Sequence, residues 1–176
     1  WNPALPVGCA SARRKMQFQQ LYPEAVIQPV RGNVLTRLDK LDSGEYGALI
    51  LAEAGLKRLG LSDRIAYRFS PEELVPAAGQ GILAIQTRAG EYADLLARLN
   101  FLDGALCAKT ERQLALLLGG DCSAPVGCHA QLHGTDMTLY GFSGIGGVPR
   151  YGSVQGNRND ADLLVQQLAS KLTITE

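Results

Sequence analysis

The sequence has 176 residues, 46% of them hydrophobic and 19% charged, which predicts a soluble, globular protein of one domain or two small ones. The formal net charge is zero and only 6% of the residues are aromatic, which argues against a nucleic-acid partner. No apolar run is long enough to span a membrane and no secretory signal pattern is present, so we expect a cytoplasmic protein without a membrane partner.

The charges are unevenly distributed along the chain. Residues 1–70 contain ten Lys and Arg against six Asp and Glu, whereas the remainder contains seven against eleven. An anionic ligand is therefore expected in the first part of the chain. The sequence begins at Trp1 without a methionine, and we keep open the interpretation that it is a fragment.

The first seventy residues alternate between predicted strands and helices. Residues 5–10 suit a buried strand, and Ser11 is placed to cap a helix over 12–21. Residues 24–30 predict a second strand, and the helix after "RGN" has one apolar face that leaves Arg37 outside it. We expect that face to comprise Val34, Leu35, Leu38 and Leu41.

The continuous apolar run 46–52 predicts a third strand, covered on both faces, followed by a short helix that ends at Gly60. Three strand–helix repeats imply right-handed crossovers and a mainly parallel sheet. Ligands of such sheets bind at the carboxyl ends of the strands. The residues that follow those ends are Ser11, Arg13 and Arg14, then Arg31, then the stretch from Ala52 to Arg58.

The second part of the chain has a different pattern. The prolines and glycines of 71–81 indicate a boundary, 82–88 predicts another strand, and 91–118 is helical with a break near 100–104. Short runs separated by glycines then predict an antiparallel meander, and 160–172 forms an amphipathic helix. We expect a separate small α+β domain whose last helix carries Leu163, Leu164, Leu168 and Leu172.

Five arginines are expected around one rim of the parallel sheet. A guanidinium pairs with a carboxylate through two parallel hydrogen bonds, so such a rim suits a ligand with several carboxylates. The alternative is that each arginine is an ordinary solvated surface residue. The five are Arg13, Arg14, Arg31, Arg37 and Arg58.

Four cysteines are spread along the chain, and we expect them to be reduced thiols. Cys122 and Cys128 are separated by five residues, outside the usual spacing of a zinc site, so no metal is expected. Cys9 and Cys107 are interpreted as small apolar groups. Asp121 and the carboxyl end of the preceding helix disfavour a thiolate at Cys122, which argues against a turnover nucleophile but allows a thiol that reacts once.

Three motifs resemble the porphobilinogen deaminase (hydroxymethylbilane synthase) family of tetrapyrrole and haem biosynthesis. They are "VRGNVLTRLDKLDSGEYGALILAEAGLKRLGL", "PAAGQGILAIQ" and "LLGGDCSAPVG", accompanied by "GCASARR" as a diverged form of a Gly-Thr-Ser-Ser-x-Arg-Arg motif. The resemblance extends over nearly the whole chain. It implies a transferase that joins four porphobilinogen units with loss of ammonia and then releases hydroxymethylbilane by hydrolysis.

The resemblance also implies a domain arrangement. It predicts an α/β, periplasmic-binding-protein-like domain with a parallel sheet and a small α+β C-terminal domain with an antiparallel sheet. Residues 1–76 would be most of domain 2, 79–98 a strand and helix of domain 1, and 100–176 domain 3. The full-length protein would be a monomer.

By the same resemblance, Cys122 carries a dipyrromethane cofactor through a thioether, as a primer for the growing pyrrole chain. Ser11, Arg13, Arg14, Arg31 and Arg37 would bind the cofactor. The substrate would be bound by Arg31, Arg37, Arg58, Ala52, Gly55 and Gln80.

This chain departs from the family pattern at several positions. Cys9 and Ala10 replace two hydroxyl residues of the first motif, and Asp121 is an extra residue before Cys122. No residue matches the family's catalytic aspartate, which belongs to an N-terminal region, so we expect this chain alone to be inactive. The alternative function is a non-catalytic, anion-binding module derived from the family.

Overall fold

The computed structural model describes residues 1–121 and 123–173, and these divide into two compact units. Unit 1 contains residues 1–75 together with 123–125 and 144–149. Unit 2 contains residues 76–121, 126–143 and 150–173. Among the described residues, no helix is both long and apolar enough to cross a membrane.

Unit 1 is built on a parallel sheet of three short strands. These are β1 (Val7–Gly8), β2 (Ile27–Gln28) and β3 (Ala48–Leu49), in the order β2-β1-β3. Val7 lies opposite Ile27 on one side and Ala48 on the other. The predicted parallel sheet is confirmed, although only the centre of each predicted strand joins the ladder.

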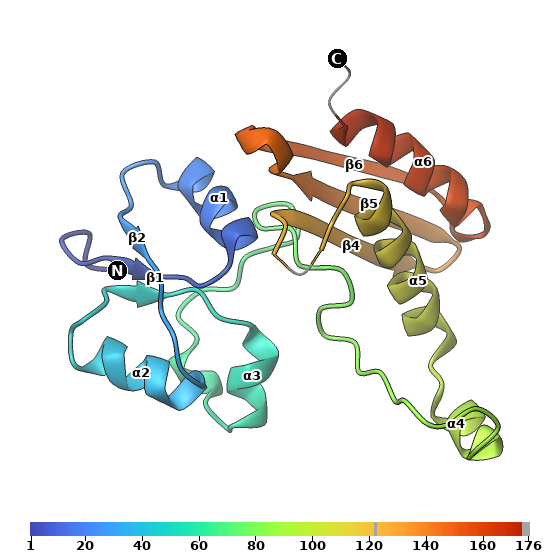
Figure 1. The fold of residues 1–176 in the computed structure, drawn as a ribbon, viewed down its shortest axis with the longest axis horizontal. Coiled ribbons are helices and arrows are strands. Elements are labelled where there is room, and N and C mark those ends of the chain that lie inside the picture. The colour runs from blue at the N-terminus through green and yellow to red at the C-terminus, as the bar shows by residue number, and fades with distance from the viewer. Residues whose placement is uncertain (122, 174–176) are drawn as a thin grey trace. The chain divides into compact units, whose positions relative to one another are not determined.

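Helices cover both faces of this sheet. Figure 1 shows α1 (Ala12–Leu21) on one side, and α2 (Val34–Asp42) and α3 (Glu53–Arg58) on the other. Asn33 caps α2 by accepting the Thr36 N–H at 2.9 Å. Gly60 ends α3 with φ +71°, a conformation that glycine adopts without strain, and this confirms the predicted helix end. A 3₁₀ turn, η1 (Ser62–Arg64), follows.

The core of unit 1 lies between α1 and the sheet. Val7, Cys9, Phe18 and Ile50 are buried together, with Phe69 packed against them. On the other side α2 buries Leu38, but the prediction that Leu35 is buried is wrong, because its side chain is 52% exposed. Leu35 is turned about 100° around the helix from Val34, which puts it beside the narrow stripe that faces the sheet.

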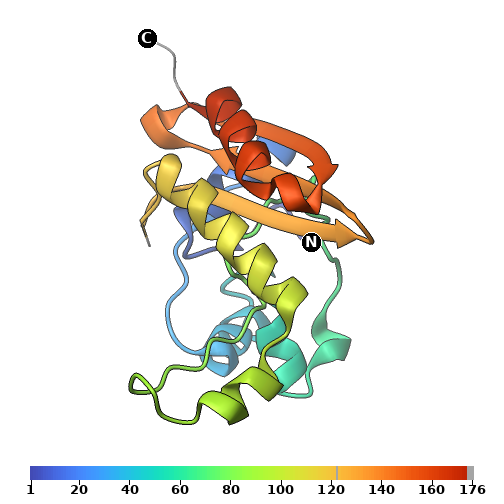
Figure 2. The same ribbon diagram turned by 90° about the vertical axis from the view of Figure 1, so that its right-hand side faces the viewer.

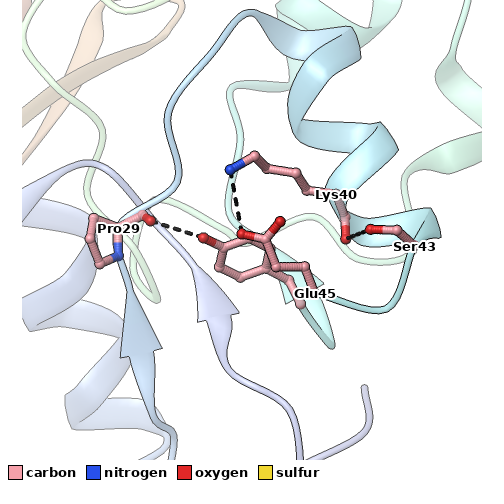
Figure 3. Close-up of polar contacts among 5 residues, drawn as sticks. Pro29, Lys40, Ser43 and Glu45 are labelled. Carbon is pink, nitrogen blue, oxygen red and sulfur yellow. Dashed lines mark hydrogen bonds and ion pairs between the residues drawn. The ribbon is translucent and has the colours of Figure 1, made fainter.

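The connection from α2 to β3 is held by local polar contacts (Figure 3). The Tyr46 hydroxyl donates to the Pro29 carbonyl at 2.9 Å, just beyond β2. Lys40 pairs with Glu45 at 3.4 Å, and the Ser43 hydroxyl donates to the Lys40 carbonyl at 3.0 Å. These contacts fix the end of α2 relative to the segment that carries Arg31.

Unit 2 contains an antiparallel meander, as predicted. Its strands are β4 (Val126–His133), β5 (Asp136–Ser143) and β6 (Arg150–Asn157), with β5 in the centre. Gly141 lies opposite Cys128 on one neighbour and Gly152 on the other. The 3₁₀ turn η2 (Ile145–Gly147) belongs to unit 1, and η3 (Arg158–Asp160) follows β6.

Two helices, α5 (Leu102–Leu117) and α6 (Ala161–Leu172), lie side by side on one face of the meander (Figures 1 and 2). α6 buries Leu164, Val165, Leu168 and Leu172. Leu163, which we also expected on this helix, is 57% exposed and lies one position outside the apolar stripe. A Cβ on Gly141 would come within 2.5 Å of the Leu172 side chain, which shows how closely α6 approaches the sheet.

The segment before α5 differs most from expectation. The predicted helical break is confirmed, because α4 (Ala93–Leu99) ends before α5 begins. The predicted strand over 82–88 is wrong, because none of these residues is in a strand, and Leu83 and Ile85 are 77% and 60% exposed. An apolar run forms a strand only where a neighbouring strand can share backbone hydrogen bonds with it. Among the described residues, no strand pairs with residues 82–88.

Candidate functional site

Ser11 lies between the end of β1 and the start of α1. Its Oγ accepts the backbone N–H of Arg14 at 3.4 Å, which confirms the predicted cap. A hydroxyl that accepts one hydrogen bond still has its own O–H to donate. The Ser11 O–H is therefore chemically suited to a carboxylate near the first turn of α1.

The two adjacent arginines of α1 have different environments. Arg13 is buried, and its Nη1 donates to the carbonyl of Val75. The structure thus gives Arg13 a contact that holds the chain together within unit 1. A ligand role for Arg13 stays a prediction.

Arg14 is only partly buried, and its Nη1 donates to the Ile50 carbonyl at 3.4 Å. Burial is the main cause that lowers the pKa of the Arg14 guanidinium, and the Cys9 thiol acts in the opposite direction. The positive charge of Arg37 lowers the pKa further, so these two cations lie within electrostatic reach of each other. An anion bound between them would relieve this repulsion.

Arg37 extends from the first turns of α2, where its Nε donates to the Gly32 carbonyl at 2.8 Å. Within the described chain, Arg31, Arg37 and Arg58 form no ion pair, whereas Arg64, Arg68, Arg88 and Arg158 each pair with a carboxylate. Three of the predicted ligand arginines therefore keep guanidinium donors for an external anion.

The other predicted contact residues lie in both units. Ala52 precedes α3, and the Gly55 N–H donates to its carbonyl at 3.0 Å. A Cβ on Gly55 would meet only Val34, at an ordinary 3.5 Å, so packing within unit 1 does not require glycine there. Gln80 belongs to unit 2, where its N–H donates to the Ala77 carbonyl at 3.0 Å in an exposed turn.

Cys122, the predicted cofactor cysteine, lies outside the described residues. Cys9 is buried and its thiol donates to the Ser11 carbonyl at 3.6 Å. Burial raises the pKa of the Cys107 thiol, and the charges of Glu111 and Asp103 raise it further. Over residues 1–121 and 123–173, no group of three or more His, Cys, Asp or Glu side chains is arranged to hold a metal.

Two buried polar residues were not predicted from the sequence. Gln17 of α1 and Glu111 of α5 are both buried and make hydrogen bonds to backbone groups distant in the sequence. Glu111 lies three residues before buried Leu114 and seven before buried Leu118. Helical spacing alone would therefore have placed this carboxylate on the apolar side of its helix.

Several described side chains of unit 1 are chemically suited to an anionic ligand. Arg14 and Arg37 are coupled cations, Arg31 has no ionic partner among the described residues, and Ser11 retains a hydroxyl donor. Several guanidinium groups match a ligand with several carboxylates better than one with a single negative charge. The residues present thus fit a carboxylate-rich cofactor or substrate.

Comparison with known proteins gives two adjoining family matches. Residues 2–94 match a family described as porphobilinogen deaminase, dipyromethane cofactor binding domain, and residues 105–173 match porphobilinogen deaminase, C-terminal domain. The first match covers the three-stranded parallel sheet and the five predicted ligand arginines. The second covers most of α5, the meander and α6.

Curated relatives named porphobilinogen deaminase are similar over most of this chain. The protein of Acetivibrio thermocellus is 43% identical over 172 residues, covering 95% of this chain and 58% of its own length. That of Thiobacillus denitrificans is 44% identical, covering 97% and 57%, and that of Chromobacterium violaceum 46%, covering 94% and 55%. The chain thus spans less than three-fifths of these relatives, and it belongs to the porphobilinogen deaminase family.

Proposed function

We propose that this chain is the greater part of a hydroxymethylbilane synthase, a transferase of tetrapyrrole biosynthesis. The enzyme would join four porphobilinogen units, with loss of one ammonia for each, onto a dipyrromethane primer attached to Cys122. Hydrolysis would then release hydroxymethylbilane and leave the primer on the protein. Relatives named porphobilinogen deaminase, similar over nearly the whole of this chain, support this proposal.

The observation that carries the proposal is the pair of porphobilinogen deaminase family matches, over residues 2–94 and 105–173. The interacting positive charges of Arg14 and Arg37 agree with it. Each pyrrole of the primer and of the substrate bears acetate and propionate side chains, so the growing product is a polyanion. Two neighbouring guanidiniums from different helices can bind separate carboxylates or share one. A carboxylate bound near both would offset the repulsion between their positive charges.

Within unit 1, we assign Ser11, Arg14, Arg31 and Arg37 to carboxylates of the cofactor, with Arg13 beside them in the same motif. Arg31 and Arg37 would also contact the substrate, together with Arg58 and the backbone at Ala52 and Gly55. Gln80 would also contact the substrate. When bound, the dipyrromethane supplies the terminal ring to which the first porphobilinogen is joined.

Catalysis would also require residues beyond this chain. None of its carboxylates matches the aspartate that the family uses to hold the pyrrole N–H groups. We also propose that residues 79–98 belong to a separate domain of the natural polypeptide. The complete protein would act in the cytoplasm as a monomer, without nucleic acid.

Intact-mass measurement tests the proposal directly. The natural polypeptide, including any residues encoded ahead of Trp1, should carry the added mass of a dipyrromethane when freshly purified. Cys122→Ser should remove that mass, whereas Cys107→Ser should retain it, because Cys107 is a partly buried thiol with a raised pKa. The same preparation should consume porphobilinogen.

An unmodified Cys122 in protein that also leaves porphobilinogen unchanged would refute the proposed function. An unmodified Cys122 in protein that binds polycarboxylates through Arg14 and Arg37 would favour the non-catalytic module instead. Modification at a different cysteine would refute the attachment site alone.

A further inference from the structure

The carboxylate of Glu111 is buried inside unit 2. Glu111 lies in the middle of α5 and is only 2% exposed. A charged side chain in such a place is stable only when hydrogen bonds replace the lost water. All the partners described below belong to unit 2.

Both oxygens of Glu111 accept backbone N–H groups from distant segments. Oε2 accepts the N–H of Gly79 at 2.6 Å, and Oε1 accepts the N–H of Ala130 in β4 at 2.8 Å. His129 also places Nδ1 3.3 Å from Oε1, and its ring stacks on Tyr140. One carboxylate therefore joins α5, β4 and the turn at Gly79.

This turn is attached to unit 2 at two points. The carbonyl of Pro76 accepts the N–H of Cys128 at 2.8 Å, and Glu111 holds Gly79 three residues later. Gly79 has φ +73°, and the Gln80 N–H closes the turn on Ala77. The peptide group held by Glu111 is thus the one between Ala78 and Gly79, in the middle of the turn that Gln80 closes.

We propose that Glu111 is a positioning residue that presents the side-chain amide of Gln80 to substrate. The inference rests on the proposed function, which assigns Gln80 to substrate contact. Glu111 itself touches no reacting atom. It holds the central peptide of the turn from Ala77 to Gln80, and this turn sets the backbone position from which the Gln80 side chain extends.

Glu111→Gln is the sharpest variant because it retains the size of the side chain. A carboxylate offers two acceptor oxygens, whereas an amide offers one oxygen and one N–H₂ donor. Either Gly79 or Ala130 would then face a donor instead of an acceptor. Thr110→Val is the matched control, because Thr110 is also buried in α5 but its hydroxyl donates only to the Leu106 carbonyl of the same helix.

The structural effect can be measured on the 176-residue chain by amide hydrogen exchange. In Glu111→Gln, the amides of Gly79 and Ala130 should exchange at least about tenfold faster than in the original chain, since each tenfold corresponds to 1.4 kcal/mol. Thr110→Val should leave both rates unchanged. Unchanged exchange at Gly79 in Glu111→Gln would overturn the proposal.

The functional effect requires the natural polypeptide and its kinetics with porphobilinogen. Glu111→Gln and Gln80→Ala should each raise KM about tenfold, the cost of roughly one well-placed hydrogen bond, and Thr110→Val should not. The double variant should be no worse than Gln80→Ala, because Glu111 acts through Gln80. Additive effects, or a silent Gln80→Ala, would overturn the proposal, since a merely structural Glu111 predicts additivity.

The two proposals fail in different ways. If the protein carries its dipyrromethane and turns over porphobilinogen while Glu111→Gln keeps the original KM, only the positioning role is overturned. If the original protein carries no adduct and consumes no porphobilinogen, the proposed function is overturned and the positioning role falls with it.

Discussion

The side chain of Gln17 makes a two-way hydrogen-bonded pair with the backbone of Val75. Its Nε2 donates to the Val75 carbonyl at 3.1 Å, and its Oε1 accepts the Val75 N–H at 2.7 Å. The side-chain amide of Gln17 thus satisfies both backbone polar groups of Val75, as a neighbouring strand would. The chain leaves unit 1 from a residue that is fixed on α1.

Replacing Gln17 should therefore destabilise the protein. Gln17→Met keeps the volume but leaves the buried Val75 N–H without an acceptor, so we expect a loss of about 1–3 kcal/mol in the free energy of unfolding. Gln20→Met, on the exposed side of the same helix, should change it by less than about 0.5 kcal/mol. Chemical denaturation of the two variants checks this, and equal stabilities would contradict it.

Charge reversal at Arg37 should weaken binding of the pyrrole carboxylates. We expect Arg37→Glu to raise the KM for porphobilinogen at least about tenfold, because it removes a guanidinium and adds a repelling carboxylate. Lys15→Glu gives the same change in net charge at an exposed position of α1 and serves as the control. Arg158 is less suitable as a control, because it pairs with Asp103. Similar effects of the two reversals would discredit the proposed anion site.

Gly55→Ala should separate packing from function. The added methyl meets only ordinary contact with Val34, and alanine is favoured over glycine inside a helix, so stability should rise by about 0.5–1 kcal/mol. If the substrate approaches the backbone at Gly55, the same methyl should raise the KM for porphobilinogen. Thermal unfolding and steady-state kinetics measure the two effects. A destabilised variant would show that the packing argument is wrong.

We expect the carboxylate of Glu73 to cause part of the acid sensitivity of unit 1. The Tyr67 hydroxyl donates to it at 2.6 Å and the Ser70 N–H at 2.8 Å, and these bonds, led by that of Tyr67, lower the pKa of Glu73. A lowered pKa in the folded state means that the contribution is present above the ordinary carboxyl pKa and is lost as the pH falls through the lowered value.

In Glu73→Gln, the melting temperature should accordingly fall less between neutral and acidic pH than in the original protein. Glu24→Gln, at an exposed carboxylate on the same unit, should leave the slope as it is. Melting curves over a pH series give the comparison. The same slope in all three proteins would mean that Glu73 does not contribute to acid sensitivity.

Much of the fold could be predicted because local chemistry determines it. Ser11 begins α1 and Gly60 ends α3 through interactions within one or two turns, and both were identified from residue type and position. The strand expected at 82–88 failed because strand formation depends on a neighbour, which no local pattern reveals. Leu35 was misplaced because a position at the edge of an apolar stripe can face either way.

The candidate site was predictable in part. Its arginines follow strand ends, and topology brings Arg14 and Arg37 within reach of each other. That Arg13 contacts Val75 could not be foreseen, because 62 residues separate the two in the sequence. The same holds for Glu111. Helical spacing places it on the apolar side of α5, but its partners Gly79 and Ala130 come from other segments of the chain.

The different surroundings of Arg13 and Arg14 affect how distant relatives should be judged. Arg13 supports the fold whether or not any ligand binds, so a descendant that had abandoned its chemistry would still be under pressure to keep it. Arg37 makes a local contact to the Gly32 carbonyl, so substitutions there would be better tolerated once the ligand was gone. The conservation of Arg13 alone would therefore say little about whether a relative still binds a ligand.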